Sequence, residues 1–269
     1  MEREQGLFLT NVEATTRNGI TIKSHQEIRT MYEAGRVVAA IKQTLLDTIE
    51  PGMKTKDLDA IASNVIKSHK AKPSFKGYHG FPATICVSIN NEIVHGIPGD
   101  RIIEEGDIVS MDVGAVVSGF HSDSAVTIAV GKVQPEVDRL IENTRLSLEL
   151  GVKQAVAGNR VGDIGYAVQN FAEAQGYGVV REYVGHGIGR ALHEEPSIPN
   201  VGEQGKGPLL RVGMVICIEP MLNMGTWQTK VLDDDWTVVT ADGSLSAHFE
   251  QTLAITENGP WVLTALEGE

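Results

Sequence analysis

The sequence predicts an α+β protein in which two pairs of helices cover one face of a curved, largely antiparallel sheet. Two observations support this fold class: each half of the chain contains two helical segments and then strand-like runs, and the second half repeats features of the first. With 269 residues, 42% of them hydrophobic, the chain can bury one large core. We therefore expect a single domain over residues 20–269 and, because no periodicity is evident there, an N-terminal arm over residues 1–19.

Caps and helix breakers place the first pair of helices. Ser24 and Glu27 have the spacing of a capping box, which predicts a helix over residues 25–48. Pro51-Gly52 ends this helix, and Thr55 is expected to cap a second helix that extends to about residue 70.

The second pair follows the same kinds of signal. Pro135 is expected in the first turn of a helix that extends to about residue 156, and Asp163 begins another helix that Gly176 ends. Apolar or alternating runs predict the strands. These runs cover residues 84–89, 108–115, 122–130, 178–184, 214–219, 236–240 and 248–256.

Two aspartates lie in the central strand-like runs. Asp112 follows one run and Asp123 begins the next, while Gly114 and Ser118-Gly119 between them indicate a turn, so a hairpin would bring both carboxylates to one end. At an effective dielectric of about 20, two carboxylates roughly 4 Å apart repel by about 4 kcal/mol. Such a pair requires a shared proton or a metal ion, unless both side chains cap turns in solvent.

Two glutamates and a histidine carry related signals. Glu219 ends an apolar run in M-V-I-C-I-E-P-M, and Glu250 lies in the last strand-like run, A-H-F-E-Q-T-L-A-I-T. Burial of an unpartnered carboxylate is unfavourable, so each position requires an ion or hydrogen-bond donors. His186 lies between glycines, which permit close backbone approach and leave the imidazole free to bind an ion. Oxygen-rich ligation with one imidazole suits a pair of divalent ions such as Co, Mn, Fe or Zn.

An internal repeat relates these residues to one another. The segment P-G-M-K-T-K-D-L-D-A-I at 51–61 aligns with A-G-N-R-V-G-D-I-G-Y-A at 157–167, and E-G-D-I-V-S-M-D at 105–112 aligns with V-G-M-V-I-C-I-E at 212–219. Two related halves that face each other would place four acids around one pair of ions, with a histidine from each half beside them. The predicted pairs are Gly52 with Gly158, Asp57 with Asp163, Asp112 with Glu219, Asp123 with Glu250, and His95 with His193.

Seven motifs make the chain resemble the bacterial type I methionine aminopeptidases, which belong to peptidase family M24 and have the pita-bread fold. Between about residues 20 and 264 the motifs are V-H-G-I-P, G-D-I-V-S-M-D-V-G, F-H-S-D-S-A, G-H-G-I-G, L-H-E-E-P, I-E-P-M and H-F-E-Q-T. The resemblance implies two pseudo-symmetric halves and a catalytic metalloaminopeptidase domain. It implies removal of the initiator Met from nascent proteins and peptides with a small second residue, by water that two divalent ions activate. It is compatible with a monomer that associates transiently with the ribosome.

Carried over residue by residue, the resemblance assigns the site. Glu219 would accept a proton from the attacking water, His193 would stabilise the oxyanion, and His95 would bind substrate and relay protons. Either histidine alone would more often be a structural hydrogen-bonding residue. The metal ligands would be Asp112, Asp123, His186, Glu219 and Glu250. The substrate-binding residues would be His95, His193, Tyr78, Phe81, Cys86 and Trp236.

Two positions depart from the family pattern. Leu192 stands where an aromatic residue is common, and Phe75 stands where a cysteine is common. We therefore expect a reshaped pocket rim with the chemistry retained. Core packing is the alternative interpretation for all of the apolar pocket residues.

Composition argues against several other classes. Two cysteines, no apolar stretch near 18 residues, and an N-terminus that is neither basic nor apolar favour a cytoplasmic, reducing setting without a membrane span. The formal net charge of −12 disfavours a nucleic-acid substrate. The sequence contains no H-E-x-x-H zinc helix, no Cys-x-x-Cys pair, no G-x-S-x-G serine elbow and no phosphate-binding P-loop.

Three other functions share part of this pattern. A proline-specific peptidase of the same fold, such as a prolidase or aminopeptidase P, would use the same five ligands but usually carries a large additional N-terminal domain. A non-catalytic binding module would be expected to have lost ligands. A structural metal-binding protein would not require His95 and His193 beside the ions. Metal content and peptide turnover distinguish these functions.

Overall fold

A computed structural model describes residues 16–17, 19–266 and 268, so most of the predicted arm at residues 1–19 lies outside the described residues. Within this range the four predicted helices form two packed pairs. None of the described helices is long and apolar enough to cross a membrane. The helices are α1 His25–Thr48, α2 Thr55–Ser68, α3 Pro135–Gln154 and α4 Val161–Ala174, with a short 3-10 helix, η1, at Tyr78–Gly80.

The first two helices begin where side chains accept backbone N–H groups. The predicted capping box of α1 is present, with the Ser24 hydroxyl accepting the Glu27 N–H at 3.3 Å and the Glu27 carboxylate accepting the Ser24 N–H at 3.0 Å. Thr55 was predicted to cap α2, but it is the first residue of the helix. The N-cap is Lys54, whose N–H donates to the Asp57 carboxylate at 2.8 Å.

Helix α4 begins in the same way as α2. The start predicted at Asp163 is two residues late, because this carboxylate lies in the first turn and accepts the Arg160 N–H at 2.7 Å. Asp57 and Asp163 therefore perform the same capping role in the two halves. This equivalence confirms that part of the predicted repeat.

The turn before each of these helices also repeats. Gly52 and Gly158 have positive φ angles of 96° and 98°, a conformation that L side chains rarely adopt. The Gly52 N–H donates to the Ile103 carbonyl at 2.8 Å, and the Gly158 N–H donates to the Leu210 carbonyl at 3.1 Å. The two halves thus share a backbone arrangement as well as a sequence pattern.

The strands form four sheets within the described residues, and every described strand pairing except β2–β10 is antiparallel. The sheet orders are β1-β2-β10-β9-β11-β16-β17, β15-β12-β8, β13-β14-β5, and β3-β6-β4 with β7 beside β6. The bounds are β1 Thr16–Arg17, β2 Ile20–Thr21, β3 Lys72–Pro73, β4 Ile85–Ile89, β5 Glu92–Val94, β6 Ile108–Val117, β7 Phe120–Ala129, β8 Gly178–Val179, β9 Gly185–Gly187, β10 Glu194–Ile198, β11 Val215–Ile218, β12 Met221–Asn223, β13 Thr229–Val231, β14 Val238–Thr240, β15 Ser246–His248, β16 Gln251–Thr256 and β17 Gly259–Val262.

Two of the predicted strands differ from the observed ones. Only β8 forms at the start of the run 178–184. The run 248–256 divides into β15 and β16 because its backbone changes partner. His248 pairs with Met221 in β12, whereas Glu250 exchanges backbone hydrogen bonds with Ala125 in β7 at 3.3 and 3.0 Å.

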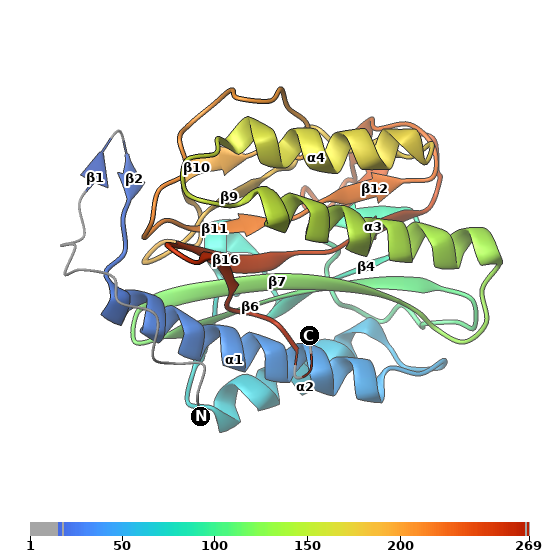
Figure 1. Cartoon of the computed structure of the whole chain (residues 1–269). Helices are drawn as coiled ribbons and strands as arrows, with labels where there is room; N and C mark the ends of the chain where they lie inside the picture. Colours follow the sequence, from blue (N-terminus) through green and yellow to red (C-terminus); the bar gives the residue numbers. More distant parts are fainter. Residues whose placement is uncertain (1–15, 18, 267, 269) are drawn as a thin grey trace.

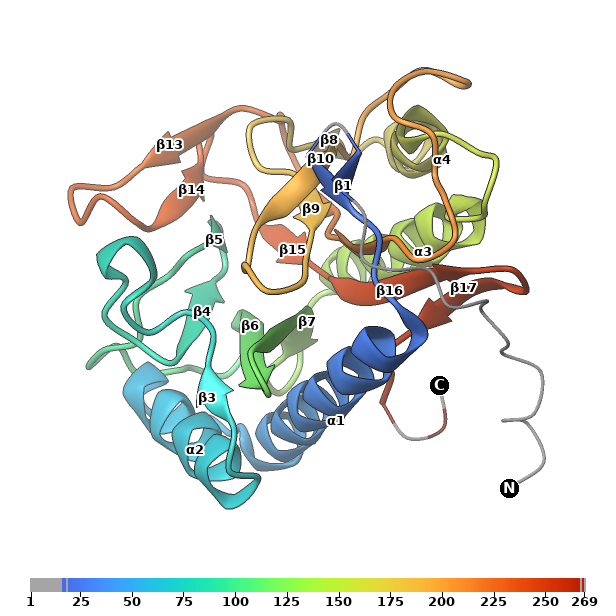
Figure 2. The same ribbon diagram turned by 90° about the vertical axis from the view of Figure 1, so that its left-hand side faces the viewer.

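The helix pairs cover one face of the strands and leave the other face free for polar side chains. Met111 of β6 packs in the core with residues of α1 and α2, and Ile218 of β11 packs with residues of α3 and α4. Because side chains alternate along a strand, Asp112 and Glu219 point to the opposite face. Figure 1 shows the α1–α2 pair below the central strands and the α3–α4 pair above them, and Figure 2 shows hairpin β13–β14 on the side away from the helices.

Strand register corrects one predicted pair of the repeat. The β6–β7 register sets Asp112 opposite Ala125. The β11–β16 register, continued by one residue, sets Glu219 opposite Glu250. The counterpart of Glu250 is therefore Ala125, and the predicted pairing of Asp123 with Glu250 is wrong by two residues. Motif similarity could not detect this shift, because it depends on which residues face each other across the strands.

Candidate metal centre and substrate pocket

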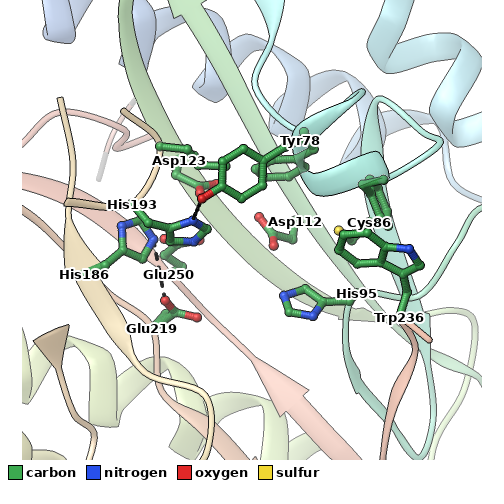
Figure 3. A pocket seen from close by; sticks show the side chains of 13 residues that line it. Tyr78, Cys86, His95, Asp112, Asp123, His186, His193, Glu219, Trp236 and Glu250 are labelled. Atoms are coloured by element: carbon green, nitrogen blue, oxygen red, sulfur yellow. Dashed lines mark hydrogen bonds and ion pairs between the residues drawn. The ribbon is translucent and has the colours of Figure 1, made fainter. Parts of the chain in front are cut away.

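Four carboxylates converge on the face of the strands that the helices leave open (Figure 3). Asp112 lies within β6 and Asp123 within β7, whereas Glu219 directly follows β11 and Glu250 directly precedes β16. Asp123 and Glu250 are buried, with 4% and 2% of their surface exposed to water. The predicted acids are thus brought together from both halves of the chain.

The two aspartates were predicted to lie at one end of their hairpin, but they lie in its middle. Gly114 is a strand residue that pairs with Asp123, and the turn lies at Ser118-Gly119. A Cβ atom at Gly114 would lie 2.7 Å from the Ser74 Cβ and 2.8 Å from the Phe75 ring. The glycine therefore permits close packing of a neighbouring segment and does not reverse the chain.

The potential ligand atoms form two adjoining groups. Those of Asp112, Asp123 and Glu250 all lie within 4.8 Å of one another, as do those of His186, Cys217 and Glu250. Glu219 adjoins the second group, since its Oε1 lies 3.8 Å from the His186 Nε2. The described residues thus contain two possible ligand groups that share Glu250.

His186 is oriented by its own backbone. A Cβ at Gly185 would lie 2.3 Å from a carbonyl oxygen of β11, and one at Gly187 would lie 2.2 Å from a carbonyl oxygen of β10, which confirms the expected close backbone approach. The Nδ1–H donates to the Gly187 carbonyl at 2.9 Å, so the Nε2 lone pair faces Glu219. The 3.8 Å gap is too long for a hydrogen bond but suits two ligands that each lie about 2.0–2.2 Å from one ion.

The acids are electrostatically suited to a cation. Burial raises the pKa of Asp112 to about 7 and, together with the charge on Asp112, raises the pKa of Glu219 to about 8. Burial and neighbouring acids raise the pKa of Asp123 and Glu250 well above their usual range. Asp112 Oδ1, Asp123 Oδ1 and Glu250 Oε1 are buried and have no hydrogen-bond partner among the described residues. Divalent ions would coordinate these oxygens and neutralise the negative charge of the carboxylates.

We expect the metal-free protein to lose stability as the pH rises from about 7 to about 8.5. Asp112 and Glu219 hold their protons more tightly when folded, with pKa values of about 7 and about 8, than in the unfolded chain. Protonation therefore favours folding, and this contribution disappears as the pH rises through those values. The buried His186, whose pKa is lowered to about 3, is neutral in both states in most of this range.

Melting curves of chelated protein across this pH range test the expectation. Metal-loaded protein serves as the control and should show a smaller change, because bound ions replace the protons. A melting temperature of the metal-free protein that stays constant or rises over the same range would show that these carboxyls do not control its stability.

Two histidines lie on either side of the acids (Figure 3). The His193 ring packs against that of His186 with centroids 4.2 Å apart, and its Nδ1 is 2.7 Å from the Tyr78 hydroxyl. His95 directly follows β5, whereas His193 directly precedes β10, so they do not occupy equivalent places in the repeat, contrary to the predicted pairing. Burial lowers the pKa of both histidines, that of His95 to about 4, and both are therefore neutral near pH 7.

The apolar residues predicted for substrate binding line the same cavity as the acids. Phe81 and Trp236 make an edge-to-face contact with ring centroids 5.1 Å apart. The cavity has a volume of about 120 Å³, several times what one water needs. Its lining comprises all eleven predicted site residues, Tyr78, Phe81, Cys86, His95, Asp112, Asp123, His186, His193, Glu219, Trp236 and Glu250, together with Phe75 and Leu192.

Two residues beside the acids were not singled out from the sequence. The His248 ring is buried, its Nε2 lies 3.7 Å from Glu219 Oε2, and burial lowers its pKa to about 3. Cys217 contacts the Thr252 hydroxyl at 3.3 Å, and burial together with the neighbouring acids raises the pKa of its thiol well above the usual value. The motif H-F-E-Q-T contains His248, but only the fold shows that it faces Glu219.

Comparison with known proteins decides the family. The model of Metallopeptidase family M24 matches residues 29–257. The methionine aminopeptidase of Clostridium acetobutylicum is 51% identical over 249 residues, which are 92% of this chain and 100% of that protein. Methionine aminopeptidase 1 of Bacillus subtilis is also 51% identical, and the match covers 91% of this chain and 99% of that protein. The chain belongs to the methionine aminopeptidase family.

Solved structures agree with this assignment. The methionine aminopeptidase of Thermotoga maritima has a TM-score of 0.90 and 46% identity, and the match covers 91% of this chain and 99% of that chain. The prolidase from Pyrococcus furiosus has a TM-score of 0.76 and 25% identity, and the match covers 91% of this chain but 66% of the prolidase. These similarities confirm the expected pita-bread fold, and membership of a metallopeptidase family implies the use of divalent metal.

Proposed function

We propose that this methionine aminopeptidase family member releases N-terminal Met from nascent proteins and peptides with a small second residue, and that it acts with two divalent ions. The observation that carries this proposal is the juxtaposition of two ligand groups with an apolar pocket in one cavity. When bound, the ions would supply a Lewis acid and lower the pKa of water. They would be Co, Mn, Fe or Zn, held by Asp112, Asp123, His186, Glu219 and Glu250.

The side chains of the site have complementary roles in this proposal. Glu219, whose pKa is raised to about 8, accepts the proton of the attacking water. The His193 Nδ1 lies 2.7 Å from the Tyr78 hydroxyl, and in the tautomer that accepts from this hydroxyl the proton of the neutral imidazole is on Nε2. His193 can then donate a hydrogen bond to the developing oxyanion. His95, on the other side of the acids, binds the substrate near the scissile amide and relays protons (Figure 3).

The pocket walls favour an unbranched thioether side chain. Phe81 and Trp236 present aromatic rings. The buried Cys86 of β4 pairs with Asp112 of β6 and adds a small apolar surface to the cavity. A flexible methionine side chain packs well against such rings. Phe75 and Leu192, which differ from the common family residues, lie in the wall of the same cavity and alter its shape while leaving the acids unchanged.

The proposal extends to the cellular setting. We place the protein in the cytoplasm as a monomer, with residues 20–269 as its single catalytic domain, in transient association with the ribosome where initiator Met is exposed. The family assignment supports this placement. Neither nucleic acid nor membrane is part of the proposed function.

A peptide panel tests the substrate assignment. We expect Met-Ala-Ser to be cleaved and Met-Lys-Ser to be cleaved at least tenfold more slowly, because a long second side chain would collide with the wall of the site. N-formyl-Met peptides should resist cleavage, since formylation removes the free amine. Products are read by mass spectrometry. Preferential cleavage of Xaa-Pro bonds, whatever the first residue, would assign the chain to the proline-specific branch instead.

A further inference from the structure

The loop between β9 and β10 carries part of the cavity wall. Residues 188–193 connect the two strands, and the last two of them, Leu192 and His193, line the cavity. Within the loop, the Gly189 N–H donates to the Ala191 carbonyl at 3.1 Å. The position of the His193 ring therefore depends on what fixes this loop to the rest of the protein.

A buried ion pair closes the loop. Glu194 directly follows His193, and its Oε1 accepts the Ala191 N–H at 3.1 Å. Its Oε2 accepts a hydrogen bond from the Lys23 Nζ at 2.7 Å, and the two side chains are 2% exposed for Lys23 and 13% for Glu194. Burial lowers the pKa of Lys23, and the hydrogen bond and charge of Glu194 oppose that shift. Removal of one partner would leave the other as an unpaired buried charge.

The backbone of Lys23 is anchored independently of the loop. Its N–H donates to the Gly213 carbonyl at 2.7 Å. Three residues earlier, Ile20 of β2 pairs with Glu195 of β10, and α1 begins two residues later. The ammonium therefore reaches Glu194, 171 residues away in the chain, from a segment that is fixed on both sides.

Gly189 makes room for the ion pair. A Cβ atom there would lie 2.6 Å from the Glu194 Oε1 and 2.7 Å from the Lys23 Cε, so both side chains would have to move. The first two glycines of G-H-G-I-G, Gly185 and Gly187, admit the backbone of neighbouring strands. The third glycine instead admits these two side chains, which places the ion pair directly against the loop.

The loop has another ionic contact, which is exposed. The Arg190 Nη2 lies 3.5 Å from the Glu27 Oε1, and the Arg190 side chain is 68% exposed. Its guanidinium also lies over the Phe120 ring, 4.6 Å or less from the ring centroid at 4.2 Å. Exposed ion pairs contribute little to stability, because water and salt screen them. The buried pair is therefore the stronger restraint on the loop.

We propose that Lys23 and Glu194 are positioning residues that hold His193 toward the metal centre. The inference rests on the oxyanion role of His193 in the proposed function. The lining residues of the cavity include neither Lys23 nor Glu194, so the pair acts through the loop. A hydrogen-bond donor must be placed accurately, and a misplacement of about 1 Å can lower a rate by about 10²-fold.

The Lys23→Met variant removes the ammonium and keeps an apolar stem. We expect kcat for Met-Ala-Ser to fall by about 10- to 10²-fold, while KM and metal content stay within about twofold of the wild type. The unpaired Glu194 carboxylate would turn toward water and draw the loop with it. Lys23→Met combined with Glu194→Gln removes both charges and keeps an acceptor for the Ala191 N–H, so kcat should recover toward the wild-type value.

A double-mutant cycle with His193→Ala separates positioning from a general structural effect. If the pair acts through His193, Lys23→Met should lower kcat no further in the His193→Ala background. Gly189→Ala provides a second cycle, because it displaces the ends of two flexible side chains without removing a charge. It should fold and show the same dependence on His193, and it takes the place of Lys23→Met if that variant does not fold.

Arg190→Met is the matched control, since it removes the exposed ionic contact from the same loop. Its kcat should stay within about twofold of the wild type. A loss of kcat equal to that in Lys23→Met would overturn the assignment to the buried pair. The inference is also overturned if Lys23→Met and Gly189→Ala retain wild-type kcat, or if they lower it by the same factor with and without His193.

Loss of bound metal in Lys23→Met would place its effect at His186, on the neighbouring strand, and would likewise overturn the inference. Failure of the proposed function is a separate result. It would appear in the wild-type chain as a lack of peptide hydrolysis, or in His193→Ala alone as an unchanged kcat. Steady-state kinetics and elemental analysis of the metal-loaded variants provide every readout.

Discussion

Complete removal of metal is expected to reduce hydrolysis of Met-Ala-Ser to the uncatalysed background and to lower the melting temperature at pH 8. The lining residues include no serine or lysine, and burial raises the pKa of the Cys86 thiol well above its usual value, so we expect water to be the nucleophile and to require activation. Without ions, the buried carboxylates of Asp112, Asp123 and Glu250 face one another within 4.8 Å. Exhaustive chelation followed by elemental analysis, a turnover assay and a melting curve measures both effects.

Restoration by added metal is the control for chelation. Wild-type activity should return, whereas Asp112→Ala and Glu250→Ala should regain little, because Asp112→Ala removes ligand oxygens from one group and Glu250→Ala removes them from both. Metal content should fall in both variants along with activity. Undiminished turnover in protein that elemental analysis shows to be metal-free would refute the metallopeptidase mechanism for this chain.

His193→Ala is expected to lower kcat by about 10²- to 10³-fold while metal content stays close to that of the wild type. An oxyanion donor acts mainly in the transition state, so KM should change much less than kcat. The His193 ring lies beside His186, yet its Nδ1 is engaged by the Tyr78 hydroxyl at 2.7 Å. His193 belongs to neither of the two ligand groups, which supports a donor role rather than a ligand role.

The matched control is Tyr78→Phe, which keeps the aromatic ring and removes only the hydroxyl that orients His193. We expect a smaller loss of kcat than in His193→Ala and no change in metal content. Steady-state kinetics and metal analysis of both variants decide between the two roles. A loss of metal in His193→Ala comparable to that in Asp112→Ala would make His193 a ligand instead.

The sequence by itself determined the α+β class, the helices and the identity of the acids, because those depend on local signals. The Ser24–Glu27 capping box and Pro135 in the first turn of α3 act within a few residues of the helix starts that they predict. An acid at the end of an apolar run, such as Glu219 after β11, is also visible locally. The repeated glycines before α2 and α4 and the repeated aspartates in their first turns are local signals of the same kind.

Only the tertiary structure decided how these residues face one another, because that depends on partners far away in the chain. It placed Gly114 inside a strand and divided the last strand at Glu250, where the backbone moves from β12 to β7. It also brought Lys42 of α1 to the Ser124 hydroxyl of β7, 82 residues away in the chain. Local patterns cannot specify such contacts, since the partner strand and its register are fixed by packing of the whole core.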